Sequence, residues 1–296
     1  MSWLLIVTVA YALNAVAMAI DKALLKKEVP RPTAYAFYIA ALGIISLVLL
    51  PFDWQIPPGG QLIFNLLAGA TFTAGLYLMF VALKQADASR VTPFIGGLNP
   101  VFIFILAWWF LGERLTGQQI LGFLVILAGT FLIAVNFSGK KEVGRAFLVA
   151  IPSAVLFAIS YTLTKFVYLN QPFISGFVFI RVGAFLAALL FLLSRANRRA
   201  IFQTAGTASG GSKLAFAVGQ TAGALSMVLV SWAISLASVS LVNGLQGLQY
   251  VFLFFIILVL KDKHPELLAE NLTPKVYAQK IISIGLIILG LFLISV

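Results

Sequence analysis

Long apolar stretches, separated by short polar or turn-forming segments, follow one another along this whole chain. A stretch of about 20 apolar residues is long enough to cross the hydrocarbon core of a membrane as a helix. Strands of a membrane barrel would be about 10 residues long and would alternate apolar with polar positions, which these stretches do not. The pattern predicts an all-α membrane protein with ten transmembrane helices, near residues 3–24, 33–51, 61–83, 91–111, 117–136, 146–168, 173–194, 213–235, 238–260 and 277–295.

The second half of the chain repeats the first. The matching segments are 97–102 with 247–252 and 129–133 with 290–294, and Pro32 and Gly43 match Pro172 and Gly183. We therefore expect two five-helix repeats, residues 1–139 and 140–296, in a single membrane domain. Because each repeat has an odd number of helices, the second copy must be inverted in the bilayer, which is typical of alternating-access transporters.

Composition excludes several other classes of protein. Hydrophobic residues make up 61% of the chain and charged residues 10%, whereas roughly a quarter of a soluble domain is charged. The first apolar stretch is too long, and lacks the preceding positive residue, for a cleavable signal. The chain has no cysteine, one histidine (His264) and no carboxylate deep within a predicted helix. We therefore expect no catalytic residues, no metal site and no cofactor, and a protein that is not an enzyme.

The basic residues lie on one side of the predicted bundle. Loops after odd-numbered helices hold Lys26, Lys27, Arg31, Lys84, Arg90, Lys140, Lys141, Arg145, Arg195, Arg198, Arg199, Lys213, Lys261, Lys263, Lys275 and Lys280, and loops after even-numbered helices hold Arg114. This positive-inside bias predicts that the odd loops are cytoplasmic and both termini extracytoplasmic. The net charge of +11 thus indicates membrane topology and not a nucleic-acid partner. We expect a multi-pass protein of the cell membrane, of the prokaryotic inner-membrane kind.

Two connections are longer than the others. Residues 195–212 are predicted to form a loop, with three arginines followed by a flexible Thr/Ala/Ser/Gly tract from residue 204. Residues 261–274 are amphipathic enough for a short interfacial helix.

Residues 89–135 strongly resemble the EamA-type repeat of the drug/metabolite transporter superfamily. The features that carry the resemblance are Pro100 within a helix, the Gly-Glu-Arg-Leu-Thr turn at residues 112–116, and the glycines Gly122 and Gly129. The second half matches more weakly, since Tyr250 replaces the proline. The resemblance implies a ten-helix transporter in which helices five and ten brace the bundle. Members carry amino acids, other metabolites, nucleotide sugars or phosphorylated sugars, and amino-acid export is the outcome that the family favours.

The fourth and ninth helices are expected to form opposite walls of a central pathway. Pro93, Gly96, Gly97 and Pro100 share one face of the fourth helix and weaken its backbone hydrogen bonding, and freed carbonyls need protein partners or a wet cavity. The equivalent face of the ninth helix carries Asn243, Gln246, Gly247 and Tyr250. The alternative interpretation is close helix packing through small residues.

Three cations are candidates for function. Arg181 lies near the middle of the seventh helix, and a buried arginine suits a carboxylate or phosphate bound at two points; it could instead cap helix carbonyls. Lys22 and Lys165 are symmetry partners near opposite ends of the membrane, where each could form a gate or simply extend to the headgroups. Glu113 is expected to organise its turn beside Arg114.

These patterns predict a carrier of small polar metabolites, amino-acid-like and zwitterionic or anionic, working by alternating access. Export is the direction that the family resemblance favours. The alternative is a lipid or lipid-linked metabolite translocase of the same fold. The expected partners are the metabolite and the lipid bilayer, and the protein is expected to be a monomer or a homodimer. The predicted pathway residues are Asn14, Tyr77, Gly96, Asn99, Pro100, Tyr161, Lys165, Arg181, Gln220, Trp232, Asn243, Gln246 and Tyr250, with Lys22 and Lys165 as gates.

Overall fold

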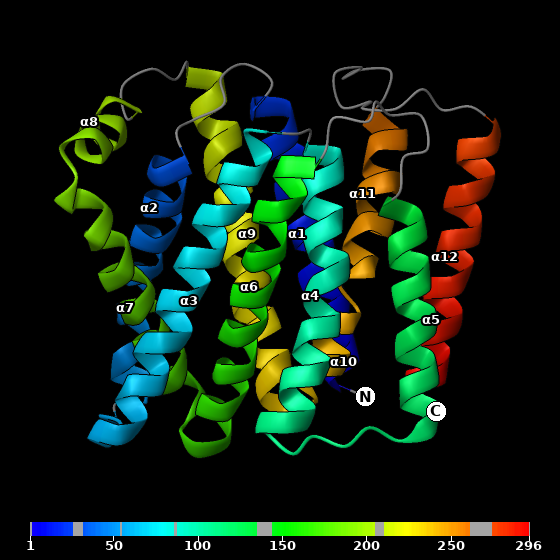
Figure 1. The fold of residues 1–296 in the computed structure, drawn as a ribbon, viewed down its shortest axis with the longest axis horizontal. Coiled ribbons are helices and arrows are strands. Elements are labelled where there is room, and N and C mark those ends of the chain that lie inside the picture. The colour runs from blue at the N-terminus through cyan, green and yellow to red at the C-terminus, as the bar shows by residue number, and fades with distance from the viewer. Residues whose placement is uncertain are drawn as a thin grey trace.

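The computed structural model describes residues 2–25, 32–53, 55–85, 88–134, 144–204, 210–260 and 274–295. Across these residues the chain is helical, without strands (Figure 1). Nine helical segments in this part of the chain are long and apolar enough to cross a membrane, and a tenth, Gly117–Ile133, is apolar but shorter. The predicted all-α membrane fold is confirmed.

The helices fall at the ten predicted positions. The first half comprises α1 Ser2–Leu25, α2 Pro32–Leu42 with its 3-10 continuation η1 Gly43–Phe52, α3 Gly59–Leu83, α4 Ala88–Phe110 and α5 Gly117–Ala134. The second half comprises α6 Gly144–Asn170, α7 Phe173–Leu189 with η2 Leu190–Leu193, α9 Gly210–Leu236, α10 Val239–Gly244, α11 Gly247–Leu260 and α12 Pro274–Ser295. Proline stands at the first position of α2 and α12 and at the N-cap of α3 and α7, where the missing N–H is not needed.

An eleventh helical segment, α8 Arg195–Thr204, occupies the first part of the connection that the sequence predicted as a loop. Its arginines Arg195, Arg198 and Arg199 are exposed, whereas Ile201 is buried. The hydroxyl of Tyr38 in α2 donates to the carbonyl of Ile201 at 2.7 Å. The segment is therefore an amphipathic helix with its apolar side on the bundle. The predicted interfacial helix at 261–274 lies almost wholly outside the described residues.

The helix break falls in the ninth span and not in the fourth. The helix α4 continues through Pro93 and Pro100, whereas the ninth span is divided into α10 and α11 between Gly244 and Gly247. At the break the N–H of Gln246 donates to the carbonyl of Asn243, a bond of the 3-10 type. The carbonyl of Val242, which would have accepted that N–H in a continuous helix, accepts the hydroxyl of Tyr11 at 3.0 Å instead.

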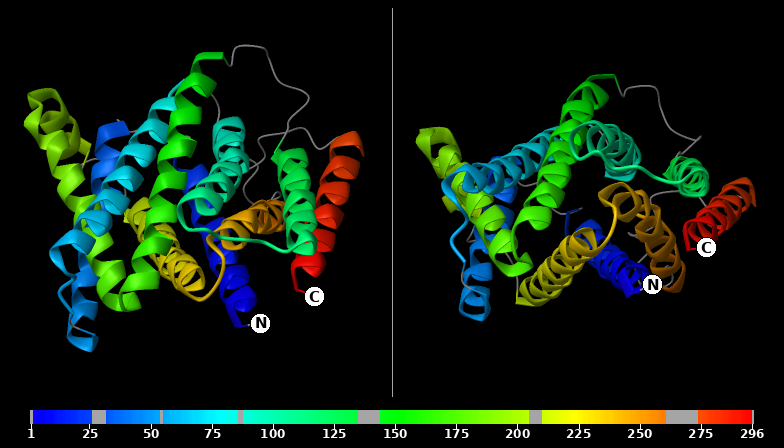
Figure 2. Two further views of the ribbon diagram at one scale, coloured as in Figure 1. Left: turned by 60° about the horizontal axis from the view of Figure 1, so that its bottom comes forward. Right: turned by 90° about the horizontal axis from the view of Figure 1, so that it is seen from below.

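The two halves of the chain pack crosswise. Counterpart helices of the two halves, such as α1 and α6 or α3 and α9, run in opposite directions (Figure 1). The helix α3 packs on α6, and α1 packs on α9; likewise α4 packs on α6, and α1 on α11. Figure 2 shows α5 and α12 side by side at one edge of the bundle. Each of these contacts between the halves therefore has its counterpart with the halves exchanged.

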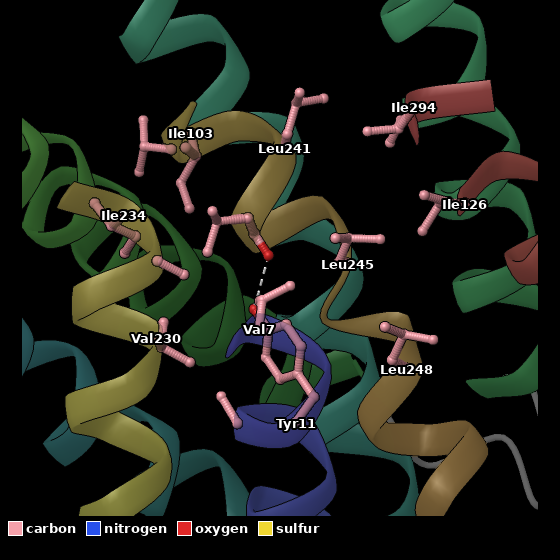
Figure 3. Packing of buried hydrophobic residues seen from close by; sticks show 14 of the residues in the cluster. Val7, Tyr11, Ile103, Ile126, Val230, Ile234, Leu241, Leu245, Leu248 and Ile294 are labelled. Carbon is pink, nitrogen blue, oxygen red and sulfur yellow. Dashed lines mark hydrogen bonds between the residues drawn. The ribbon is translucent and has the colours of Figure 1, made fainter. Parts of the chain in front are cut away.

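The largest buried apolar cluster joins the two halves at their centre. It includes Val7 and Tyr11 of α1, Ile103 of α4, and residues of α9 to α12 (Figure 3). In Figure 3 the dashed line from Tyr11 reaches the carbonyl at the start of the break in the ninth span. The core thus holds the discontinuous span against the first helix.

Candidate functional site

Arg181 lies on α7 among aromatic rings in the middle of the bundle. Its side chain is 7% exposed. The guanidinium carbon lies 5.2 Å from the ring centre of Phe72 in α3 and 5.3 Å from that of Phe177 in α7. Tyr161 and Tyr168 of α6 are close enough to interact with it electrostatically. The arrangement is a cluster of aromatic rings around one positive charge, which we call the Arg181 site.

The polar bonding of Arg181 is weak for a buried charge. Its Nη1 donates to the thioether sulfur of Met227 in α9 at 2.9 Å, and its Nε has no hydrogen-bond partner among the described residues. A thioether is a weak acceptor, and a buried ion without strong partners is strongly destabilising. The predicted alternative, that Arg181 caps helix carbonyls, has no support in these contacts.

Lys165 differs from Arg181 because strong acceptors surround its ammonium. Its Nζ donates to the carbonyls of Ile234 at 2.9 Å, Ala237 at 2.8 Å and Ser235 at 3.5 Å, all at the C-terminal end of α9. A cation at this end of a helix satisfies carbonyls that lack an intrahelical partner. Lys165 therefore ties α6 to the end of α9 near the membrane boundary.

Glu113 reaches across to the second half of the chain. Gly112 adopts a φ of 67° at the end of α4, a conformation that glycine adopts without strain, and the chain then turns toward α10. The carboxylate of Glu113 accepts the Ser238 hydroxyl at 2.8 Å and the N–H groups of Val239 at 3.1 Å and Ser240 at 3.4 Å. The sequence predicted that Glu113 organises its own turn, whereas in the structure its carboxylate caps the N-terminal end of α10.

Glu113 and Lys165 hold one and the same connection. The C-terminal end of α9 is bound by Lys165, and the N-terminal end of α10 is bound by Glu113. Their charges are also close enough to attract each other. The connection between α9 and α10 is therefore fixed by one residue from each half of the chain, at the end of the bundle where both termini lie (Figure 1).

The two predicted walls touch each other. A β-carbon on Gly96 of α4 would lie 2.2 Å from the hydroxyl of Tyr250 in α11 and 3.2 Å from Nε2 of Gln246. Tyr250 donates to the carbonyl of Thr92 at 3.2 Å. At this level the face of α4 is packed against the ninth span, as the alternative interpretation expected. Gly97 of the same predicted face packs instead on the ring of Phe131 in α5.

Some predicted pathway residues make hydrogen bonds inside the bundle, and others hold buried polar atoms without a partner among the described residues. Asn14 of α1 donates to Gln249 of α11, whose amide contacts the sulfur of Met18. Asn243 bonds within its own helix to Val239. Asn99 is buried, and its side-chain oxygen has no hydrogen-bond partner among the described residues. Within the described residues, the hydroxyls of Thr162 in α6 and Ser240 in α10 also lack a hydrogen-bond partner. These two helices pack on α4 and on each other.

The other predicted residues take no part in the contacts described above. The rings of Tyr77 and Phe191 are tilted against each other with their centres 5.4 Å apart, and Pro100 is buried within α4. Gln220 is half-buried, and Trp232 is 44% exposed. The side chain of Lys22, the second predicted gate, lies outside the described part of the chain.

One cross-half polar pair was missed by the sequence analysis. Asn65 of α3 and Gln171, which follows α6, exchange two amide hydrogen bonds at 3.0 and 2.8 Å, and Asn65 also approaches the carbonyl of Gly176 at 3.4 Å. A lone buried asparagine in an apolar helix is the available signal for such a pair.

The fold and these contacts define the class: a multi-pass α-helical membrane protein whose halves exchange polar contacts around a buried cation. The chain belongs to the EamA-like transporter family, whose model matches residues 1–135. A curated relative, an uncharacterized transporter in the cobO 3′ region of a Sinorhizobium species, is 38% identical over 95 residues, which is 31% of this chain and 67% of the relative. A crystal structure shares the fold over 99% of this chain and 96% of its own, with a TM-score of 0.70 and 21% identity. The resemblance inferred from residues 89–135 is confirmed.

Proposed function

We propose that this protein moves a small polar metabolite, zwitterionic or anionic, through the cell membrane by alternating access, as a carrier and not as an enzyme. Residues 1–139 and 140–296 form the two inverted halves. The observation that carries the proposal is the crosswise packing, in which α3 on α6 is matched by α1 on α9 and α4 on α6 by α1 on α11. Halves related in this way can exchange inward and outward arrangements by rocking against each other.

Buried polar groups on helices of both halves support a solute pathway. In the described part of the chain, four helices each hold a buried side-chain polar atom without a hydrogen-bond partner: Asn99 on α4, Thr162 on α6, Arg181 on α7 and Ser240 on α10. Buried polar atoms without partners are costly, and in a carrier they find partners when the solute or water enters. The single buried guanidinium of Arg181 favours a solute with a negatively charged group.

The test of the carrier function is uptake by the purified chain in liposomes. Labelled amino acids and organic acids supplied on one side are expected to enter protein-containing vesicles faster than empty ones, and to exchange with unlabelled solute loaded inside. A matched assay measures flipping of a labelled phospholipid in the same vesicles. Lipid movement without solute uptake would refute the proposal in favour of a lipid translocase.

The proposed topology places the basic loops in the cytoplasm and both termini outside. Two glycines provide a matched pair for this test, because Gly60 at the start of α3 and Gly144 at the start of α6 are exposed, and a β-carbon added to either would meet no atom within 4 Å. They lie at opposite ends of the bundle (Figure 1), and the chain has no native cysteine. In intact cells an impermeant maleimide is expected to label Gly60→Cys but not Gly144→Cys. The reverse pattern would invert the topology.

A further inference from the structure

We propose that the Arg181 site binds a monovalent carboxylate with a flat apolar body. Without ligand, the sulfur of Met227 accepts the hydrogen bond from Arg181 that the carboxylate accepts once it binds. This inference rests on the carrier function proposed above, because it narrows that carrier's substrate class from zwitterionic or anionic metabolites to monoanions. Three features of the molecule support it: the charge of the Arg181 site, its aromatic rings and the weak hydrogen bond to Met227.

One negative charge would balance the Arg181 site. The carboxylate of Glu113 is engaged by Ser238 and by α10, and Asp53 lies at the far end of η1. The ammonium of Lys165 is already satisfied by carbonyls of α9. Among the described groups that these contacts place near Arg181, its own guanidinium is therefore the charge left to be balanced. A monoanion neutralises it, whereas a phosphate dianion or a zwitterion would leave net charge in a surrounding of low dielectric constant.

The donors of Arg181 fit a carboxylate. A guanidinium presents its N–H groups in a planar fork that matches the two oxygens of a carboxylate. The Nε group of Arg181 is buried and has no partner in the described part of the chain, so at least one donor of the fork is ready for a ligand. An anion there would convert an unsatisfied donor into a charge-assisted hydrogen bond.

The aromatic rings of the Arg181 site can contact a flat apolar body. Phe72 and Phe177 lie 5.2 and 5.3 Å from the guanidinium, and Tyr161 and Tyr168 of α6 lie within electrostatic range of it. Aromatic side chains attract planar ligands by stacking and edge contacts. They supply no carboxylate to bind an ammonium, whose charge would also be repelled by Arg181.

The sulfur of Met227 can be displaced by a ligand. Its sulfur accepts from Nη1 of Arg181 at 2.9 Å, although a thioether is a weak acceptor and a carboxylate bond to the same donor is roughly twice as strong as a neutral one. Methionine has a flexible, unbranched side chain, and Met227 is only partly buried. Displacement of the sulfur by the incoming carboxylate therefore exchanges a weaker bond for a stronger one.

The first test is a matched ligand series with the purified full-length protein in detergent. Binding is measured by thermal shift and tryptophan fluorescence with phenylpropanoate, with phenylalanine, which adds an ammonium, with phenylphosphate, a dianion, and with phenylpropanol, which is neutral. Phenylpropanoate is expected to bind roughly tenfold or more tightly than the other three, as about one uncompensated charge or lost ion pair requires. Equal or tighter binding of phenylalanine or phenylphosphate would overturn the inference.

The second test substitutes Met227. Met227→Leu keeps the volume but removes the acceptor, and it is expected to bind phenylpropanoate a few-fold more tightly because no sulfur bond must be broken. Met227→Glu supplies an internal carboxylate to Arg181 and is expected to lose binding more than tenfold, whereas the neutral control Met227→Gln stays within a few-fold of the wild type. If Met227→Glu does not fold, Met227→Leu and Arg181→Gln decide: unchanged affinity in both variants overturns the inference.

These binding tests separate this inference from the carrier proposal. Phenylpropanoate binding without uptake of any labelled solute would support the carboxylate site at Arg181 and refute transport. Uptake of labelled metabolites by a protein that does not bind phenylpropanoate would support the carrier and refute the monocarboxylate site.

Discussion

Replacing Gly69 with alanine is expected to destabilise the protein, although alanine is the better helix former. Gly69 of α3 lies against the backbone of α7, where an added β-carbon would be 2.1 Å from the carbonyl oxygen of Ile180 and 2.3 Å from the nitrogen of Ala184. Backbone atoms cannot rotate out of the way as side-chain atoms can. The two helices must therefore move apart by roughly 1 Å, which forfeits a quarter to a half of each dispersion contact along their interface.

The magnitude follows from two opposing effects. Overpacking of a close interface costs about 1–3 kcal/mol, and exchange of glycine for alanine within a helix returns at most about 1 kcal/mol. The separation also stretches the bond from the Thr73 hydroxyl to the Ala184 carbonyl, now 3.0 Å, which is worth about 1 kcal/mol. The net expectation is a loss of about 1–3 kcal/mol, or a melting temperature lower by several degrees.

The matched control is Gly223→Ala, in the interior of α9. There the added β-carbon would meet only the Ala17 β-carbon at 3.7 Å, an ordinary contact, so this variant is expected to be neutral or slightly stabilised. Thermal unfolding in detergent, followed by the fluorescence of the five tryptophans, compares the two. A melting temperature of Gly69→Ala equal to or above that of Gly223→Ala would refute the close crossing of α3 and α7.

The remaining predictions concern the connection between α9 and α10. Lys165→Met should lower the free energy of unfolding by about 1–3 kcal/mol because it leaves carbonyls at the end of α9 unpaired, while Lys165→Arg should retain part of that stability; equal melting temperatures for the two would exclude the cap. Glu113→Ala should cost about 0.5–2 kcal/mol as a lost helix cap, and Glu113→Gln, which keeps an acceptor for Ser238, should cost less. If Glu113→Gln proves the more harmful in the same unfolding assay, the capping role is wrong.

The positions of the ten helices could be predicted from the sequence because of a constraint that the bilayer imposes. A segment in hydrocarbon must satisfy its own backbone hydrogen bonds, so apolar length alone marks each helix. The same reasoning failed at α8, because arginines in a loop and arginines on one side of an interfacial helix have the same composition. Burial of Ile201 beneath Tyr38 depends on the neighbouring α2.

The sequence pointed to weakened backbone hydrogen bonding in the fourth span and gave no sign of the break in the ninth, for a related reason. Pro93 and Pro100 remove N–H donors from α4 without ending it, and neighbouring helices can accommodate the loss. In the ninth span, Gly244 packs on the ring of Phe123 and Gly247 on the hydroxyl of Thr130, so neighbouring side chains occupy the space beside the glycines. The hydroxyl of Tyr11, distant in sequence, then donates to the freed carbonyl.

The candidate site could be predicted as a set of residue types but not as a set of partners. Arg181 and Lys165 are both basic residues in apolar helices, and their sequence contexts do not distinguish them. The donors of Lys165 are satisfied by backbone carbonyls about 70 residues away, and a carbonyl acceptor has no signature in the sequence. Arg181 meets a thioether and aromatic rings instead. The difference between a structural cation and one available to a ligand thus arises from what the neighbouring helices present, so only the folded arrangement reveals it.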